Sequence, residues 1–345
     1  VLAFCKKYDL WLIEDNCDAL GCTYTLPLEQ AKELGLDHLI KIAQMGNHPL
    51  IQISQLNSDG VKLLTAPTGA FGDISTQSFY PPHHLTMGEG GAVNIVRRAS
   101  LKSYAESFRD WGRDCWCPSG KDDTCGKRFQ WQLGELPEGY DHKYIYSHLG
   151  YNLKPLDIQA AIGRVQLGRL PAFIDARKRN WEALRRGLHG LEGFIEFALP
   201  THATGWNPPS AEQADDPNMV SSFAWDDSGC HTDCSWFGFK MTIKESAPFT
   251  RTDLARHLDD HKIGNRMLFG GNLVRQPAFV QLKRDRPDAF RIVDCRNDAH
   301  HTSSVNLHPS DSPDPGADRI MNQTIFLGTY PGLTKDQLVH IINVI

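Results

Sequence analysis

A short apolar run near the start of the chain, residues 10–13, places the tightest constraint on the fold because Glu14 and Asp15 follow it directly. Leu, Trp, Leu and Ile in succession predict a buried β-strand, and the two acids then lie at its carboxyl end. In open α/β sheets, ligands bind just beyond the carboxyl ends of the strands. The run therefore predicts an α/β protein in which Asp15 is a candidate cofactor-binding residue. An ordinary loop aspartate is an equally good interpretation of this feature alone.

The composition is that of a globular enzyme. The chain has 345 residues, a hydrophobic fraction of 41%, a charged fraction of 22% and a net charge of -5. These values exclude a disordered chain and the basic excess of a nucleic-acid-binding protein. No apolar run approaches the roughly 20 residues that span a bilayer, and residues 1–7 lack the organisation of a signal peptide. We expect a cytoplasmic protein with small-molecule or protein partners, no nucleic acid and no membrane.

Hydrophobic periodicity divides the chain into two domains. We expect residues 1–170 and 171–345 to form separate domains, the second of them small and with polar insertions near 200–235 and 300–316. The expected helices cover residues 28–43, 99–111, 157–170, 171–191, 250–261 and 334–345, and a strand is expected at 236–243.

The most informative segment is the glycine-rich stretch at residues 69–93, which contains Ser78, His83 and His84 followed by Leu-Thr-Met-Gly-Glu-Gly-Gly. It resembles the cofactor loop of the DegT/DnrJ/EryC1/StrS family of pyridoxal phosphate proteins, whose pattern is roughly Ser-Phe-x-x-x-Lys-x-Leu-Thr-x-Gly-Glu-Gly-Gly. Residues 12–15 and 151–163 extend the resemblance. It implies an α/β fold of type I, like aspartate aminotransferase, with a mostly parallel sheet and a smaller α/β C-terminal domain. It also implies that residues 1–170 are the C-terminal part of a large cofactor-binding domain and that residues 25–67 are an insertion in it.

The resemblance also implies roles for particular residues. Asp15 would pair with the pyridinium nitrogen of the cofactor, and Ser78 would bind its phosphate. Asn152 would reach the cofactor of the neighbouring subunit, so we expect a homodimer with a shared active site. The remaining candidates are Asp18 for the cofactor and three residues for the substrate, namely Tyr80, His84 and Arg266.

His83 stands where the family has the lysine that forms a Schiff base with the cofactor. Imidazole cannot form a stable Schiff base, but it can act as a base near neutral pH. Family members with histidine here keep pyridoxamine 5'-phosphate as a free amine and remove the C3 hydroxyl of nucleotide-linked 4-keto-6-deoxyhexoses. The resemblance therefore implies a 3-dehydratase. A degenerate, non-catalytic remnant is the alternative.

The cysteines favour one branch of these dehydratases. Cys115, Cys117 and Cys125 form a Cys-x-Cys-x7-Cys pattern that is similar to the iron-sulfur loop of the enzymes that act on CDP-linked sugars. A [2Fe-2S] cluster needs a fourth ligand. Cys17 is our choice over Cys22, because removing about 40 residues of the 25–67 insertion restores the family's spacing. By pattern alone, zinc is an alternative metal.

This branch implies a pathway position and a partner. The substrate would be CDP-4-keto-6-deoxy-D-glucose, the product would feed 3,6-dideoxyhexose synthesis for O-antigen sugars, and an NADH-dependent flavin/iron-sulfur reductase would supply electrons. The alternative without a cluster is a GDP-4-keto-6-deoxymannose 3-dehydratase. Cys230 and Cys234 lie in the polar insertion, where incidental thiols are the favoured interpretation over a metal site.

The family has well over a hundred residues before the strand that matches residues 10–13, including a helix start that holds the cofactor phosphate. Helix N-termini contribute much of the affinity for anions. We therefore expect the chain as given, an N-terminally incomplete family member, to bind pyridoxamine phosphate poorly.

Overall fold

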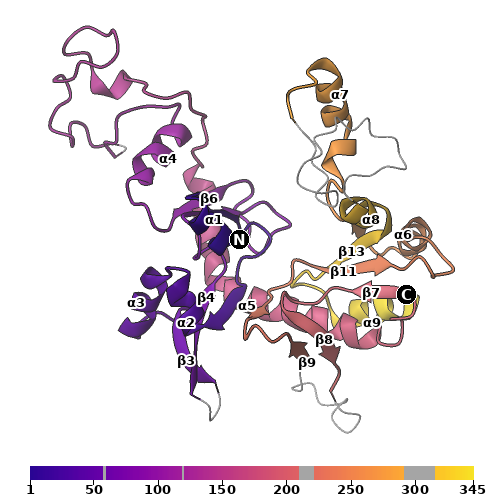
Figure 1. The fold of residues 1–345 in the computed structure, drawn as a ribbon. Coiled ribbons are helices and arrows are strands. Elements are labelled where there is room, and N and C mark those ends of the chain that lie inside the picture. Colours follow the sequence, from indigo (N-terminus) through magenta and orange to yellow (C-terminus); the bar gives the residue numbers. More distant parts are fainter. Residues whose placement is uncertain (57–59, 119, 210–220, 291–314) are drawn as a thin grey trace. The chain divides into compact units, whose positions relative to one another are not determined.

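The computed structural model describes residues 1–56, 60–118, 120–209, 221–290 and 315–345, which fold as two units. The first unit contains residues 1–174 and 225–235, and the second contains residues 175–224 and 236–345. Helix α5 (Asp157–Gly187) carries the chain from the first unit into the second (Figure 1). The expected loop at 300–316 lies outside the described residues except for its last two positions, which begin helix α8.

A three-stranded sheet, in the order β1-β5-β6, positions the cofactor loop in the first unit. Strand β1 (Ile13–Asp15) pairs in parallel with β5 (Ile74–Ser78), which pairs antiparallel with β6 (Gly91–Ile95). Glu14 fixes the loop before β5, because its carboxylate accepts hydrogen bonds from the backbone N–H groups of Gly69 at 3.0 Å and Phe71 at 2.9 Å. The strand begins three residues later than the apolar run, and its carboxyl end carries Asp15 as expected. It is not the buried strand that the sequence predicted, because Trp11 and Ile13 are exposed in the described chain.

Residues 25–67 form a compact layer of their own. Strands β2 (Thr23–Pro27), β3 (Gln52–Leu56) and β4 (Val61–Pro67) pair antiparallel, and helices α2 (Leu28–Glu33) and α3 (Asp37–Met45) pack against them. The alternating pattern of β4 buries Leu64 and Ala66 completely. The buried apolar residues of this layer are Leu26, Leu28, Ala31, Leu36, Leu39, Ile40, Ile51, Leu64, Ala66, Phe71 and Cys230.

The sheet formed by β2, β3 and β4 has a fourth strand, which comes from the insertion expected near residues 200–235. Strand β10 (His231–Asp233) pairs antiparallel with β2, so the order is β10-β2-β4-β3. The two segments that the sequence suggests are extra material are therefore hydrogen-bonded to each other. Parallel pairing, expected for most of the sheet, is found between β1 and β5, whereas β6 pairs antiparallel with β5 and the strands of the β10-β2-β4-β3 sheet pair antiparallel with one another.

Helix α5 corrects one expectation. The sequence suggested that a helix ends at residue 170 and that a second begins at Pro171, whereas α5 continues through Pro171 for 31 residues. Proline lacks the N–H that would bond to the carbonyl four residues earlier. Both flanking stretches have strong helical sequences, and the helix continues despite the loss of that one bond.

The second unit is built on a four-stranded antiparallel sheet in the order β12-β13-β11-β7. These strands are β7 (Ile195–Phe197), β11 (Gly238–Ile243), β12 (Asn265–Met267) and β13 (Thr324–Gly328). Its buried core includes Trp181 and Leu184 of α5 and the fully buried Met241 and Ile325 of the sheet. The other elements are α6 (Arg251–Asp260), α7 (Pro277–Asp285), α8 (Pro315–Gln323), α9 (Lys335–Val344), β8 (Ala203–Asn207), β9 (Ser222–Trp225) and the 3-10 turn Leu273–Arg275.

Glu192 closes the end of α5 and makes the unit sensitive to acid. Its carboxylate lies 2.7 Å from Arg185 and 2.9 Å from His189. Burial alone would raise its pKa, but the hydrogen bonds from His189 and Arg185 lower the pKa to about 2, from an ordinary value of 4.5. A lowered pKa contributes stability above pH 4.5 that is lost as the pH falls toward 2.

We expect Glu192→Gln to lower the free energy of unfolding by about 1 kcal/mol at pH 7, a value discounted because the side chain is 41% exposed. The difference should shrink as the pH falls through 2, and by about pH 1 the variant and the parent protein should have the same stability, since both then carry a neutral side chain. Urea unfolding across this pH range measures the difference, with the exposed Glu138→Gln as a control. An equal loss at every pH would show that the pair is not electrostatic.

Candidate functional site

Asp15 lies at the carboxyl end of β1, opposite Thr76 of β5. Its Oδ1 accepts a hydrogen bond from the backbone N–H of Cys17 at 3.1 Å, and the Thr76 hydroxyl lies 3.5 Å from the same atom. Hydrogen bonds from Cys17 lower the pKa of Asp15, and the nearby charge of His83 lowers it further. The side chain is exposed. Asp15 is therefore an accessible carboxylate that stays ionised at neutral pH.

His83 lies in the turn that follows β5. Its Nε2 is 3.3 Å from Asp18 Oδ1, and its Nδ1 is 3.4 Å from the carbonyl oxygen of Ser78. Its ring meets the Tyr80 ring edge-on, with the centroids 5.7 Å apart. The His83 side chain is only 15% exposed. The structure thus brings three of the predicted site residues, Asp18, Ser78 and Tyr80, around His83, and places Asp15 close enough for its pKa to respond to the imidazole charge.

Ser78 and Tyr80 lie at the start of this turn and contact each other. Ser78 is the last residue of β5, opposite Gly91 of β6, and its hydroxyl oxygen accepts from the Tyr80 N–H at 3.3 Å. A Cβ on Gly91 would lie 2.4 Å from the Gln77 carbonyl oxygen, so only glycine allows the two strands to approach this closely. Tyr80 is 47% exposed. Both side chains are within reach of a ligand at the strand end.

The other predicted residues lie in different surroundings. His84 is buried, and its Nε2 lies 3.1 Å from the Ser235 carbonyl oxygen. Asn152 is exposed in the first unit and forms an isolated β-bridge with Asp110. Arg266 is exposed on β12 of the second unit. A substrate contact by His84 would require Ser235 to move away.

The three cysteines of the Cys-x-Cys-x7-Cys pattern lie around one small cavity, together with Arg128, His142 and Lys143. Cys115 and Cys125 lie close enough to Cys117 to contribute to the lowered pKa of its thiol. Hydrogen bonds, the largest from Thr124, lower the pKa of Cys117 to about 7 against the opposing effect of burial. Thiolate is the form that binds metals and attacks electrophiles.

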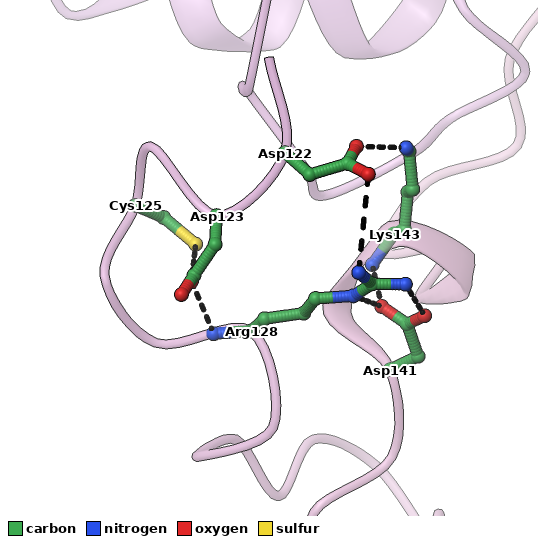
Figure 2. A network of polar contacts seen from close by, with 6 residues as sticks. All are labelled: Asp122, Asp123, Cys125, Arg128, Asp141 and Lys143. Atoms are coloured by element: carbon green, nitrogen blue, oxygen red, sulfur yellow. Dashed lines mark hydrogen bonds and ion pairs between the residues drawn. The ribbon is translucent and has the colours of Figure 1, made fainter. Parts of the chain in front are cut away.

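Ion pairs surround the loop that carries Cys125, as Figure 2 shows. Arg128 donates two hydrogen bonds to Asp141, at 3.0 and 2.7 Å, in the paired geometry that suits guanidinium and carboxylate. Lys143 bonds to Asp122, and the backbone N–H of Arg128 donates to Asp123 at 3.0 Å. Charged side chains, rather than regular secondary structure, fix residues 122–143.

The fourfold cysteine site predicted for a [2Fe-2S] cluster is not assembled. Across the residues that the structure describes, no group of three or more His, Cys, Asp or Glu side chains has an arrangement that could hold a metal ion. Cys17 is not among the residues around the cavity of Cys115, Cys117 and Cys125. Instead its backbone N–H bonds to Asp15, and its sulfur lies 3.9 Å from Thr76 Oγ1. Burial raises the pKa of Cys17, which keeps it a thiol.

One supporting residue, Thr76, and one supporting contact, that of His83 with Asp18, were not predicted. Thr76 contacts Asp15 because the parallel register of β1 and β5 sets them opposite each other, and that register cannot be deduced from either strand alone. The pairing of His83 with Asp18 was also missed, although Asp18 was a candidate. The one available signal was the concentration of acids at residues 14–18, directly after the predicted strand.

A comparison of this chain with protein families explains the arrangement. The model of the DegT/DnrJ/EryC1/StrS aminotransferase family matches residues 1–310. The chain belongs to this family. Similar curated proteins include the lipopolysaccharide biosynthesis protein RfbH of Salmonella typhimurium, which is 42% identical over 98% of this chain and 56% of its own length. The dTDP-4-dehydro-2,6-dideoxy-D-glucose 3-dehydratase of Saccharopolyspora spinosa is 38% identical over 98% of this chain and 53% of its own length.

Solved structures of DegT/DnrJ/EryC1/StrS members share the fold. The GDP-4-keto-6-deoxy-D-mannose-3-dehydratase of E. coli with bound hydrated PLP superposes with a TM-score of 0.57 at 17% identity, covering 99% of this chain and 62% of that one. An aminotransferase from Psychrobacter cryohalolentis gives the same TM-score at 15% identity and the same coverage. The predicted fold class, that of the pyridoxal phosphate-dependent sugar enzymes, is confirmed.

The family match has a limited extent. The chain spans about half the length of the curated relatives it matches first. Within the described segments of this DegT/DnrJ/EryC1/StrS member, no helix is both long and apolar enough to cross a bilayer.

Proposed function

We propose that the protein removes the C3 hydroxyl of a nucleotide-linked 4-keto-6-deoxyhexose, with pyridoxamine 5'-phosphate as cofactor and His83 as base. The observation that carries this proposal is the histidine in the turn after β5, paired with Asp18 and close to Asp15. Imidazole exchanges protons near neutral pH, whereas it cannot hold the cofactor as a lysine does. Relatives named 3-dehydratases support the same reaction.

The residues of the first unit fit the cofactor chemically. When bound, it would supply an amine for the sugar carbonyl and a ring that accepts electrons. Asp15 would face the ring nitrogen and keep it protonated, because its own lowered pKa leaves it negatively charged. The Ser78 hydroxyl would donate to the phosphate. Asn152, which is exposed, would reach the cofactor of the second subunit in a homodimer.

His83 would take a proton from the cofactor carbon that bears the amine and pass it to the C3 hydroxyl, which would then leave as water. Asp18 orients the imidazole by holding Nε2 at 3.3 Å. We assign the proton transfer to Nδ1, because its contact with the Ser78 carbonyl oxygen is the longer of the two at 3.4 Å. We therefore propose that Asp18 positions the His83 ring, whereas the sequence suggested that Asp18 contacts the cofactor itself.

For the substrate we propose CDP-4-keto-6-deoxy-D-glucose. The exposed Tyr80 would stack near the sugar, and Arg266 would bind the diphosphate because guanidinium suits phosphate oxygens. We assign no substrate contact to His84, which is buried against Ser235. A GDP-linked substrate is the alternative. The GDP-4-keto-6-deoxy-D-mannose 3-dehydratase of Yersinia pseudotuberculosis is 26% identical to this chain, which is less than the 42% of the Salmonella RfbH protein.

The dehydration is tested by incubating the purified protein with saturating pyridoxamine phosphate and the CDP- or GDP-linked 4-keto sugar. We expect cofactor-dependent loss of one water from the CDP-linked sugar, detected by mass spectrometry. No loss of water from either sugar, in protein shown to bind the cofactor, would contradict the proposed function.

We also propose that Cys115, Cys117 and Cys125 hold a [2Fe-2S] cluster with Cys17 as fourth ligand, and that an NADH-dependent flavin/iron-sulfur reductase is the partner. The proximity of the three sulfurs and the lowered pKa of Cys117 support the first three ligands. Cys17 would have to lose its contact with Thr76 to join them.

Iron analysis tests the cluster. After anaerobic reconstitution we expect brown protein that contains two irons per chain, and Cys117→Ser should lose nearly all of the iron and the visible absorption because three thiolates do not retain the cluster. Cys5→Ser changes a thiol outside the proposed ligand set and is the matched control. It should keep the iron and the visible absorption. Equal iron in the two variants, or zinc in place of iron, would refute the cluster.

A further inference from the structure

Two further thiols of the first unit, Cys22 and Cys234, lie near each other, just before β2 and just after β10. Cys22 is buried, and its sulfur accepts a hydrogen bond from the Ser235 N–H at 3.2 Å. The same sulfur lies 3.3 Å from the Ser235 hydroxyl oxygen. Cys234 precedes Ser235 and is partly exposed, and it lies close enough to Cys22 to be the largest influence lowering the pKa of that thiol. Both cysteines are reduced thiols in the structure.

The register of two strands explains why these cysteines meet. Strand β10 pairs antiparallel with β2 so that Thr232 lies opposite Tyr24 and Asp233 lies opposite Thr23. The ladder ends there, and the same register continued by one residue would set Cys234 opposite Cys22. Opposed residues of an antiparallel pair have Cα atoms about 4.5–5.5 Å apart, and disulfides form across Cα separations of about 4.4–6.8 Å. A backbone that keeps this spacing one residue beyond the ladder would suit a bond between the two sulfurs.

The surroundings favour reaction of this pair. A hydrogen bond from Cys234, together with the bonds from Ser235, lowers the pKa of Cys22 to about 6 although burial opposes the shift. Thiolate is the form that attacks a disulfide. Because Cys234 is the more exposed of the two, a small reagent reaches it first, and Cys22 lies behind it as the resolving thiol.

We propose that Cys22 and Cys234 form a reversible dithiol–disulfide site whose oxidant is a small-molecule disulfide. Cys234 attacks one sulfur of the oxidant, forms a mixed disulfide and releases one small thiol. Cys22 then attacks the Cys234 sulfur and expels the second small thiol. The two protein thiols lose two electrons and two protons, and the oxidant gains both as it becomes two thiols.

The bond would tie the segment 225–235 to the start of β2. It would also hold Ser235, whose hydroxyl oxygen lies 2.9 Å and whose carbonyl oxygen lies 3.1 Å from Nε2 of His84. Oxidation would therefore reduce the motion of the turn that carries His84. The inference does not depend on the proposed dehydration or on the cluster, because neither Cys22 nor Cys234 takes part in either.

Peptide mapping of the full chain tests the site. The protein is equilibrated with a series of ratios of oxidised to reduced glutathione, its remaining thiols are alkylated, and the peptides are identified by mass spectrometry. We expect a Cys22–Cys234 linked peptide that becomes the predominant form in oxidising mixtures and disappears on reduction. Stable glutathione adducts at Cys234 with Cys22 still alkylated, or a bond from Cys22 to another cysteine, would overturn the proposal.

Cys230→Ser supplies a matched control from the same segment. Cys230 is buried, and its sulfur donates to Gln30 Oε1 at 3.2 Å, so this variant should still form the Cys22–Cys234 bond. Amide hydrogen exchange in residues 225–235 should slow on oxidation of the parent and Cys230→Ser proteins, but not of Cys234→Ser. Exchange that is unaffected by oxidation in all three proteins would contradict the proposed link to Ser235.

Discussion

Replacement of His83 by glutamine is expected to reduce the rate of dehydration by about 100- to 10,000-fold, the usual contribution of a positioned general base. The glutamine amide can still donate a hydrogen bond to Asp18, which lies 3.3 Å from Nε2 in the parent protein. It has no nitrogen that can accept and release a proton near neutral pH. The substitution thus separates the proton transfer from the local packing, and single-turnover assays with saturating cofactor measure it.

His340→Gln is the matched control for this variant. His340 is exposed on α9 in the second unit, where its ring contacts the His261 carbonyl oxygen at 3.1 Å. We expect it to retain full activity, and we expect both variants to unfold at the same temperature as the parent protein. A His83→Gln protein with more than about a tenth of the parent rate would show that another group is the base, since the loss would fall below the range of general-base catalysis.

Gly112→Ala is expected to destabilise the first unit by about 3 kcal/mol or more, because two effects combine. Gly112 is buried with a φ of +84°, a conformation that L side chains rarely adopt. A Cβ built there would lie 1.8 Å from the His148 carbonyl oxygen. That atom belongs to the backbone, so it cannot move without breaking the bonds from the N–H groups of Ser147 and His148 to the Gly112 carbonyl oxygen.

Gly126→Ala separates the two effects. Gly126 has a similar φ of +66°, but no heavy atom lies within 4 Å of the added methyl position. Gly126→Ala should therefore lower the free energy of unfolding by about 1 kcal/mol, which is the cost of the left-handed backbone conformation alone. Urea unfolding of the two variants measures the difference. Equal stability of the Gly112→Ala and Gly126→Ala proteins would mean that the segments at 112 and 148 do not pack as the structure shows.

The sequence predicted the chemistry of the cofactor loop better than its geometry. The motif around Ser78 and His83 is local, so its residue types could be recognised from the chain alone. The pairing of His83 with Asp18 joins residues 65 positions apart through the contact of β1 with β5. Sequence patterns indicate that strands exist, but the register that brings their ends together depends on the packing of the whole sheet.

The two insertions show a second limit. Residues 25–67 and 200–235 were both expected to be insertions. Each contributes strands that cannot bury an apolar face alone, so β10 completes the sheet of β2. The resulting contact of Cys22 with Cys234 depends on that pairing, and no spacing rule within either segment could have revealed it.

The central claim is that His83 occupies the position of the cofactor-bearing lysine. It is tested most directly by treating His83→Lys protein with saturating pyridoxal phosphate, reducing with borohydride and mapping the peptides. We predict that the cofactor mass is found on the peptide that contains position 83, and that the parent protein carries none there, because a primary amine forms a Schiff base with the aldehyde and imidazole does not. Cofactor on a different lysine only, or on no peptide, would contradict the account.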